Sequence, residues 1–162
     1  MKRSWLWAGV SLVLGLPALA QERVNTFGDP FEQVTAALPG CPAPRPPGMT
    51  VAELRDEAHV RSQHGGSGRP GNSCRLPNSY LYDKEIIPRV SITIRQDCRF
   101  NNTSVWALGE RRLVTLMGCV GSAEESAAIE RAVGLIDDVM GVVNHLMVGT
   151  QGTPLYPTAG GK

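Results

Sequence analysis

The segment that decides the fold runs from Ser104 to Val148: SVWALGERRLVTLMGCVGSAEESAAIERAVGLIDDVMGVVNHLMV. It carries the longest continuous pattern in this chain of 162 residues. The pattern predicts a strand at 103–108, a turn at 109–112 and a strand at 113–120, followed by a helix and a third strand.

The second predicted strand alternates strictly, so its side chains divide between two faces of a sheet. One set is Val114, Leu116 and Val120, and the other is Leu113, Thr115, Met117 and Cys119. If helices cover the first face, then Trp106, Leu113 and Met117 lie on an open face, which would mark an interaction site. The alternative is that the N-terminal segment folds over this face and buries it.

Cysteines limit how the chain can be cross-linked. There are four, Cys41, Cys74, Cys98 and Cys119, and an even number in an exported chain predicts two disulfides. A turn centred near Gly109 gives paired positions that sum to about 219, which brings Cys98 close to Cys119. We therefore expect the bridges Cys98–Cys119 and Cys41–Cys74.

Downstream of the hairpin, Ser122 and Glu125 have the spacing of a capping box that begins a helix. The helix is expected to end near Asp137–Asp138, and 142–148 (VVNHLMV) to form the last strand. Residues 150–162 are expected to be a flexible tail.

Upstream, 83–97 has two interpretations. Ile86, Ile87, Val90 and Ile94 recur at the spacings of one helical face, with Asp83 as a candidate cap. However, Pro88 disfavours a helix beyond its first turn, and the run VSITI alternates as a strand would. The local pattern leaves both open.

The N-terminus resembles a secretory signal peptide in its composition. Lys2 and Arg3 precede an apolar run, and Ala18 and Ala20 occupy the small-residue positions of a cleavage site. Residues 1–20 are therefore predicted to be removed, which places the mature protein in the periplasm. The apolar run is too short for a membrane span of roughly 20 residues, and no transmembrane segment is expected in the mature chain.

Residues 21–79 form an N-terminal extension. We expect a weakly structured arm at 21–38 with a helical turn at 31–38, and then a Pro-rich connector at 39–48. A helix follows, begun by the capping box of Thr50 and Glu53 and ended by a glycine at positive φ at Gly65–Gly66.

Catalytic chemistry is not predicted. The chain has no nucleophile elbow, zinc-protease motif or phosphate-binding loop. His59 and His64 are five residues apart, so they lie on different sides of a helix and do not form a metal site. Subtracting Lys2 and Arg3 from 16 basic residues leaves 14 against 15 acidic ones, which gives no electrostatic basis for binding nucleic acid. We expect no enzyme activity, cofactor or metal.

The region from Tyr82 to Val148 resembles the BON domain of bacterial osmotically inducible periplasmic and outer-membrane-associated proteins. The similarity lies in LVTLMGCV, in the Ser-Ala-Glu-Glu helix start and in VVNHLMV. The resemblance implies an α+β fold, a small α-β-β-α-β sandwich of a three-stranded sheet and two helices, over residues 80–149. It also implies a helix at 83–97.

The same resemblance implies a non-catalytic protein that binds phospholipid and supports the integrity of the cell envelope under osmotic stress. Anionic headgroups would be met by basic residues, of which Arg111 and Arg112 lie beside Trp106, Leu113 and Met117 on the expected interaction surface. A scaffold or interaction subunit of an envelope protein assembly is the alternative function.

Overall fold

The computed structural model describes residues 22–66 and 75–161. The expected signal peptide (residues 1–20) and Cys74 lie outside the described residues. Among the described residues, no helix combines the length and the apolar character that a membrane span requires.

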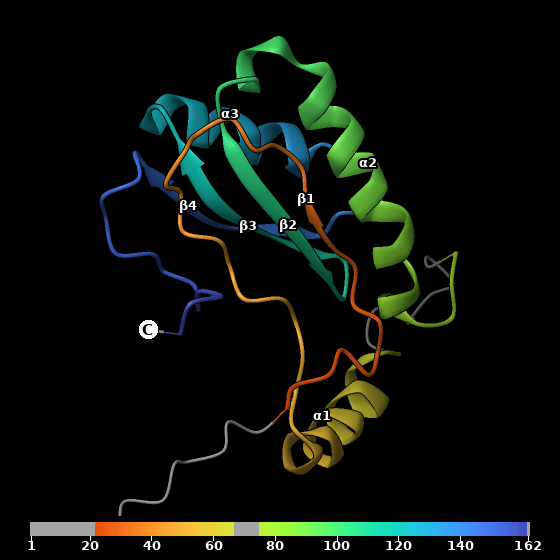
Figure 1. Ribbon diagram of the computed structural model, residues 1–162. Helices are drawn as coiled ribbons and strands as arrows, with labels where there is room; N and C mark the ends of the chain where they lie inside the picture. The colour runs from red at the N-terminus through yellow and green to blue at the C-terminus, as the bar shows by residue number, and fades with distance from the viewer. Residues whose placement is uncertain (1–21, 67–74, 162) are drawn as a thin grey trace, which may run out of the picture.

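One mixed sheet organises the molecule (Figure 1). Its four strands lie in the order β1 (Phe31–Gln33), β2 (Ser104–Glu110), β3 (Leu113–Val120) and β4 (Gly141–Val148). β2 pairs antiparallel with β1 and with β3, whereas β4 pairs parallel with β3. The three predicted strands are therefore confirmed, and β1 adds a fourth.

The helical turn expected at 31–38 is wrong, because β1 occupies its first part. The N–H of Val34 donates to the carbonyl of Val105 at 2.7 Å, and the side chain of Val34 is buried. The carboxylate of Glu32 accepts hydrogen bonds from Ser91 and Arg95 of the neighbouring helix. A three-residue strand has too little local pattern to be recognised, and its tertiary partners form it.

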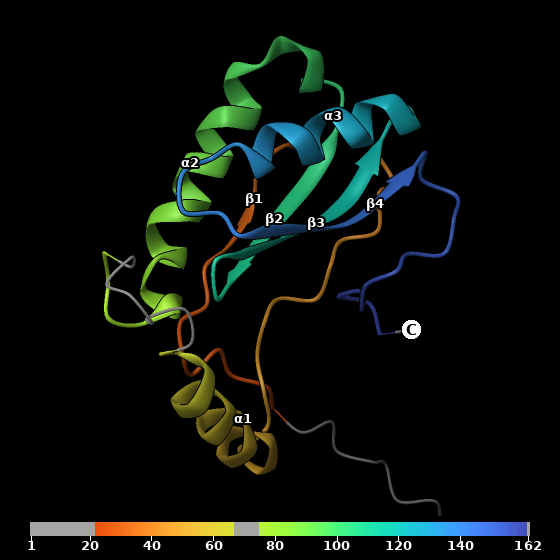
Figure 2. The same ribbon diagram turned by 180° about the vertical axis from the view of Figure 1, so that it is seen from behind.

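Two helices, α2 (Asp83–Gln96) and α3 (Ala123–Gly134), cover one face of the sheet (Figures 1 and 2). The order from α2 to β4 is helix, strand, strand, helix, strand, as the resemblance implied. The core lies between these helices and the sheet. Its fully buried members include Ile86, Ile87, Val90, Ile94, Val105, Val114, Leu116, Val120, Ile129 and Val133.

Residues 83–96 form a helix although Pro88 lies inside it. An internal proline costs about 3 kcal/mol, but each large aliphatic side chain buried in the core contributes roughly 1.5–3 kcal/mol. Ile86, Ile87, Val90 and Ile94 are all at most 2% exposed. Their combined burial outweighs the proline, so the helical spacing prevails over the alternation of VSITI.

Both predicted capping boxes begin a helix. Thr50 and Glu53 exchange hydrogen bonds at the start of α1 (Val51–His64). Ser122 accepts a bond from the N–H of Glu125, whose carboxylate accepts one from Gly121 rather than from Ser122. α3 ends at Gly134, a few residues before the expected end at Asp137–Asp138.

The expected positive φ at the end of α1 is wrong. Gly65 has a φ of −58° and continues the helical hydrogen bonding to Arg61. A Cβ at this position would come within 2.5 Å of the amide of Asn78. Gly65 therefore permits the close approach of another segment and not a left-handed turn.

Candidate functional site

The sheet face opposite α2 and α3 is the candidate site, and we call it the outer face. The strand register aligns one row of side chains across all four strands, because Leu108 pairs with Phe31 and Thr115, and Thr115 pairs with Val143. Trp106 and Met117 pair in the next row. The outer face thus carries the apolar set that the sequence placed opposite Val114, Leu116 and Val120.

One part of this face, the covered half, is buried beneath chain segments. Trp106 and Met117 are 8% and 6% exposed, and they cluster with Tyr156, which is 5% exposed. A disulfide joins Cys41 to Cys119 in β3 and holds residues of the Pro-rich connector against the sheet. Of the two outcomes that the sequence left open, burial therefore holds at Trp106 and Met117, and neither side chain is available to a partner.

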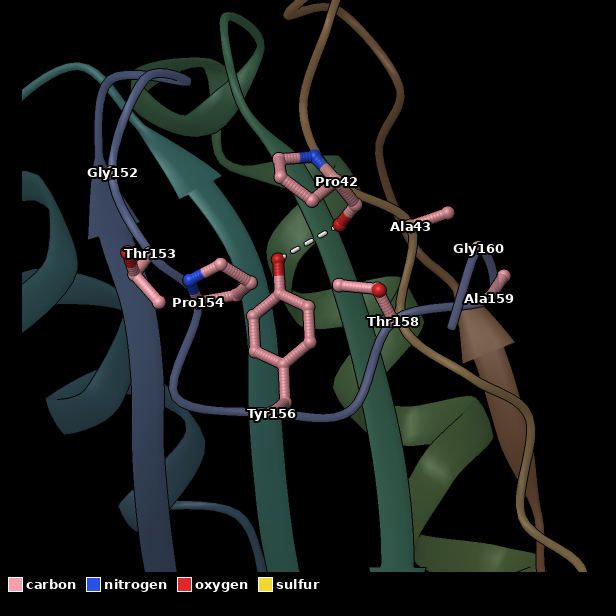
Figure 3. A pocket seen from close by; sticks show the side chains of 9 residues that line it. All are labelled: Pro42, Ala43, Gly152, Thr153, Pro154, Tyr156, Thr158, Ala159 and Gly160. Carbon is pink, nitrogen blue, oxygen red and sulfur yellow. Dashed lines mark hydrogen bonds between the residues drawn. The ribbon is translucent and has the colours of Figure 1, made fainter. Parts of the chain in front are cut away.

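The C-terminal tail supplies most of this cover. The phenol of Tyr156 donates a hydrogen bond of 2.8 Å to the carbonyl of Pro42 (Figure 3). Backbone bonds of 2.9 and 2.8 Å join Ala159 to Ala43 and Arg45 to Pro157. The expectation of a flexible tail is thus wrong for residues that pair with the connector. The tail lacks hydrophobic periodicity, but hydrogen bonds to the connector hold it in place.

Between the connector and the tail lies a pocket of about 600 Å³. Figure 3 shows the ring of Tyr156 beside it, with small side chains and prolines from both segments around it. The lining residues are Pro42, Ala43, Gly152, Thr153, Pro154, Tyr156, Thr158, Ala159 and Gly160. None of them carries a carboxylate, imidazole, thiol or amine, so this pocket has no group for acid–base or nucleophilic catalysis other than hydroxyls.

The other part of the outer face, the open half, is accessible. Leu113 and Val143 are 40% and 38% exposed. Val143 shares a row with Phe31, Leu108 and Thr115, which are half-buried, and Leu113 lies in the adjacent row. Phe31 and Leu108 also pack against the cluster of Trp106, Met117 and Tyr156, so they join the open half to the covered half. A Cβ at Gly141 would lie 3.2 Å from the Leu113 side chain, which shows that Leu113 leans across β4. Together these residues form one apolar surface.

The β2–β3 turn borders the open half. The register pairs Glu110 with Leu113, so the turn residues are Arg111 and Arg112, with φ of 57° and 66°. Paired positions therefore sum to 223 and not to about 219. The turn was predicted at Gly109, but this residue lies within β2. A Cβ there would approach the Ile87 side chain to 2.8 Å, so the glycine lets α2 pack closely.

Asp83 holds this turn in place. Its carboxylate accepts hydrogen bonds of 2.8 and 2.7 Å from the backbone N–H groups of Arg111 and Arg112. It does not cap α2, whose preceding residue is Tyr82. Burial raises the pKa of Asp83 to about 6, against the lowering effect of the two hydrogen bonds.

The arginines expected to meet lipid headgroups have intramolecular partners. Arg112 donates to the carbonyl of Asp138 at 2.7 Å, and its guanidinium lies 4.6 Å from the centre of the Tyr82 ring. Arg89 and Arg75 also contact the Asp138 carboxylate. Asp138 is thus a centre of ion pairing at the base of β4 and not part of an acid–base pair.

The disulfide pattern expected from the sequence is wrong. Cys119 is joined to Cys41 and not to Cys98. The shifted register places Ser104 opposite Cys119, while Cys98 lies in a short 3-10 turn before β2 and is exposed. The expected bridge between Cys41 and Cys74 is therefore excluded, since Cys41 is already bonded.

A second cluster of ionisable groups fastens α1 to the N-terminal arm. Arg61 makes ion pairs with Asp29 at 2.6 Å and with Glu57 at 2.7 Å, and it lies between the rings of Phe27 and Tyr80. Burial opposes the charge of Arg61, but its hydrogen bonds to the two carboxylates outweigh this and raise its pKa. The full set of contacts made by the guanidinium indicates a structural role.

Metal binding has no support in the parts of the chain that the structure describes. There, no three His, Cys, Asp or Glu side chains gather as metal ligands. The His59 ring bonds to the side chain of Gln63, and the His59 carbonyl accepts a bond from the Ser62 hydroxyl.

The sequence left two outcomes for this face, open or covered by the N-terminal segment, and each holds for one half of it. Leu113 was predicted to lie on an open face and does, whereas Trp106 and Met117 share that face but are buried. The missed residue is Tyr156, and the only available signal was an aromatic residue between Pro154 and Pro157 in a segment otherwise typical of a loop.

A comparison with models of protein families gave no match for this chain, and neither did one with curated proteins or one with solved structures.

Proposed function

We propose that this protein is a non-catalytic module of the bacterial cell envelope that binds phospholipid through the open half of its outer face. The signal-peptide pattern supports a periplasmic location. The resemblance of the region 80–149 to BON domains supports the ligand class, and the order of its helices and strands agrees with that resemblance.

The observation that carries this proposal is the exposure of Leu113 and Val143, which lie in adjacent rows of the outer face. A Leu or Val side chain moved fully out of water contributes roughly 1.5–3 kcal/mol. Two such side chains that are 40% and 38% exposed can still contribute a useful fraction of that when they enter the acyl boundary of a bilayer. Phe31 and Leu108 extend the same surface.

Ionic contacts contribute less than the sequence suggested. Arg112 is occupied by Asp138, and Glu110 lies opposite Leu113 in the register. Partial burial raises the pKa of Glu110, with nearby Asp29 acting in the same direction. Binding is therefore expected to change little with salt and to strengthen at lower pH, where protonation removes a negative charge beside the apolar row.

Co-sedimentation with vesicles tests this function. We expect the protein to bind vesicles of phosphatidylethanolamine and phosphatidylglycerol, and a Leu113→Asp/Val143→Asp variant to bind at least about tenfold more weakly. The matched control is Val51→Asp, because Val51 is 88% exposed at the start of α1. Absence of binding to anionic and neutral vesicles at pH 5 and pH 7 would reject the proposal.

A second candidate function, a subunit of an envelope protein assembly, is favoured by a different observation. β4 is a terminal strand of the sheet, and its eight residues include no Asp, Glu, Lys, Arg or Pro. Such an edge can add a strand from another chain. A protein that bound no vesicles but was recovered from cells in cross-links through β4 would support this function over lipid binding.

A further inference from the structure

The two edges of the sheet are built differently. β1 has three residues, follows Pro30 and carries Glu32, which pairs with Arg95. Short length, charge and proline are devices that protect an edge from adding further strands. β4 has eight residues and none of these devices. The protected edge and the unprotected edge lie at opposite ends of the same sheet, where β4 is the last strand (Figure 2).

The backbone direction along β4 follows from two hydrogen bonds. The N–H of Gly149 donates to the carbonyl of Val120 in β3 at 2.9 Å. The N–H of Leu146 instead donates to the side-chain oxygen of Asn144 in its own strand, at 3.0 Å. Because successive residues point their backbone groups to opposite sides, the odd positions face β3 and the even positions face outward.

From this edge we propose that the protein forms a symmetric dimer in which β4 pairs antiparallel with β4 of a second copy. Val143 belongs both to this strand and to the proposed lipid contact, but the pairing uses the backbone edge of β4 and the proposal does not depend on lipid binding. One register uses the whole strand: Val142 of one copy lies opposite Val148 of the other, Asn144 lies opposite Leu146, and His145 lies on the two-fold axis. In that register only even positions hydrogen-bond across the interface, as the backbone direction requires.

The side chains are compatible with this pairing. Val148 is 57% exposed, and pairing places it beside Val142 of the second copy. On the outer face, Val143 would lie beside Met147 of the second copy, so apolar groups meet at this pair and at the pair of Val142 and Val148, while Asn144 lies beside Leu146. The strand carries no carboxylate, ammonium or guanidinium that would be buried or brought against a like charge.

One hydrogen bond must be exchanged. The bond from Leu146 N–H to the Asn144 side chain would be replaced by one to the Asn144 carbonyl of the second copy. The Asn144 amide group keeps its own donations to Ser126 and Glu130 in α3, at 2.9 and 2.8 Å. The number of hydrogen bonds at the Leu146 N–H is thus unchanged. The backbone N–H and C=O groups of the other even positions in β4 would gain hydrogen-bond partners in the second copy.

A second copy explains the edge better than an unrelated strand does. An antiparallel two-fold lets identical strands satisfy each other along their full length, and the resulting assembly is closed. No charge pattern along β4 would select a different partner by complementarity.

Analytical ultracentrifugation of the purified full-length protein tests the pairing. We expect a reversible monomer–dimer equilibrium, and a Val148→Lys variant whose dimer dissociation constant is at least about tenfold higher, because lysine on an edge opposes strand addition. Ile92→Lys in α2 is the matched control, since Ile92 is 53% exposed and lies away from β4. It should leave the equilibrium unchanged.

Cross-linking tests the register itself. His145→Cys places two thiols on the two-fold axis, at an unbonded antiparallel pair with Cα atoms about 4.5 Å apart. In a background with Cys74→Ser and Cys98→Ser, mild oxidation should yield a covalent dimer, and Lys84→Cys in the same background should not. A wild-type protein that remains monomeric at millimolar concentration, or cross-linking that is equal at both sites, would overturn the proposal.

Discussion

The covered half and the open half of the outer face are built from the same strands and the same alternation of apolar residues. Trp106 and Met117 in one half are at most 8% exposed, whereas Leu113 and Val143 in the other are about 40% exposed. The difference comes from segments that are not part of the strand pattern: the connector near Pro42 and the tail around Tyr156.

This comparison shows that an apolar face does not by itself identify a binding surface. Near Trp106, the face is used within the molecule to hold two segments that have few apolar residues of their own. Near Leu113, no segment among residues 22–66 and 75–161 covers the face to the same extent, and the side chain is 40% exposed. Substitutions in each half can show whether the two halves differ in this way.

Removing the disulfide should release the connector from the covered half. The bridge between Cys41 and Cys119 spans a sequence separation of 78 residues, and closing a loop of that size stabilises the folded state by about 4 kcal/mol in the chain-entropy model. A Cys41→Ala/Cys119→Ala variant should lose about that free energy of unfolding in urea denaturation. An unchanged midpoint in urea would show that the connector is held without the bridge.

Tyr156 should contribute next most to the cover. Tyr156→Ala removes a buried aromatic ring and should cost about 3 kcal/mol of stability, whereas Tyr156→Phe loses only one hydrogen bond and should cost about 1 kcal/mol. In a chain that begins at Gln21, Trp106 is the only tryptophan. Its fluorescence emission should therefore shift to longer wavelength in Tyr156→Ala as water reaches the indole.

Matched substitutions keep this test specific to the covered half. Leu155 is 74% exposed next to Tyr156, and Leu155→Ala should leave both the emission and the stability within about 0.5 kcal/mol of the parent. Leu113→Ala in the open half should also leave the emission unchanged. A red shift in either control would mean that the two halves are not separate.

The smallest effect concerns the turn that borders the open half. The pKa of Asp83 is raised to about 6 from 3.8, so the folded state binds a proton more readily than the unfolded state does. The contribution of this group to folding is then largest at low pH and falls as pH rises through the interval between the two values. From pH 7 to pH 5, the group should add about 1 kcal/mol to the free energy of unfolding.

Urea denaturation at the two pH values, with the parent and an Asp83→Asn variant, measures this contribution. The variant cannot titrate at this position, so the increase on acidification should be smaller by about 1 kcal/mol. The variant should also be less stable at pH 7, because an amide offers one acceptor oxygen where the carboxylate offers two to Arg111 and Arg112. Equal pH dependence in both proteins would contradict the assignment of Asp83.

Strong local signals allowed much of the sheet-and-helix unit to be predicted. The alternation of β3, the capping box at Thr50 and the N-cap at Ser122 each depend on residues close in sequence, and the structure confirms them, although Glu125 does not complete the second box. For α2 the sequence left helix and strand equally open. The resemblance favoured a helix, and the burial of Ile86 and its neighbours provides the physical reason.

Features that depend on distant partners were missed. Gly109 suggested a turn, but it lies within β2 and lets α2 pack closely. Because the turn was expected at Gly109, the predicted register was wrong, and so was the bridge to Cys98 that was inferred from it. β1 and the ordered tail have few apolar residues and form because Val105 and the connector offer hydrogen-bond partners.

Spacing along the chain is enough to predict the strands β2, β3 and β4, the starts of α1 and α3, and the apolar character of both sheet faces. The choice of cysteine pair, the half of the outer face that is covered and the edge of the sheet that is left open follow from the folded arrangement. Those outcomes depend on contacts between residues far apart in sequence, such as Cys41 with Cys119 and Pro42 with Tyr156. No local pattern records such contacts, because their free energy arises only when the folded chain brings the partners together.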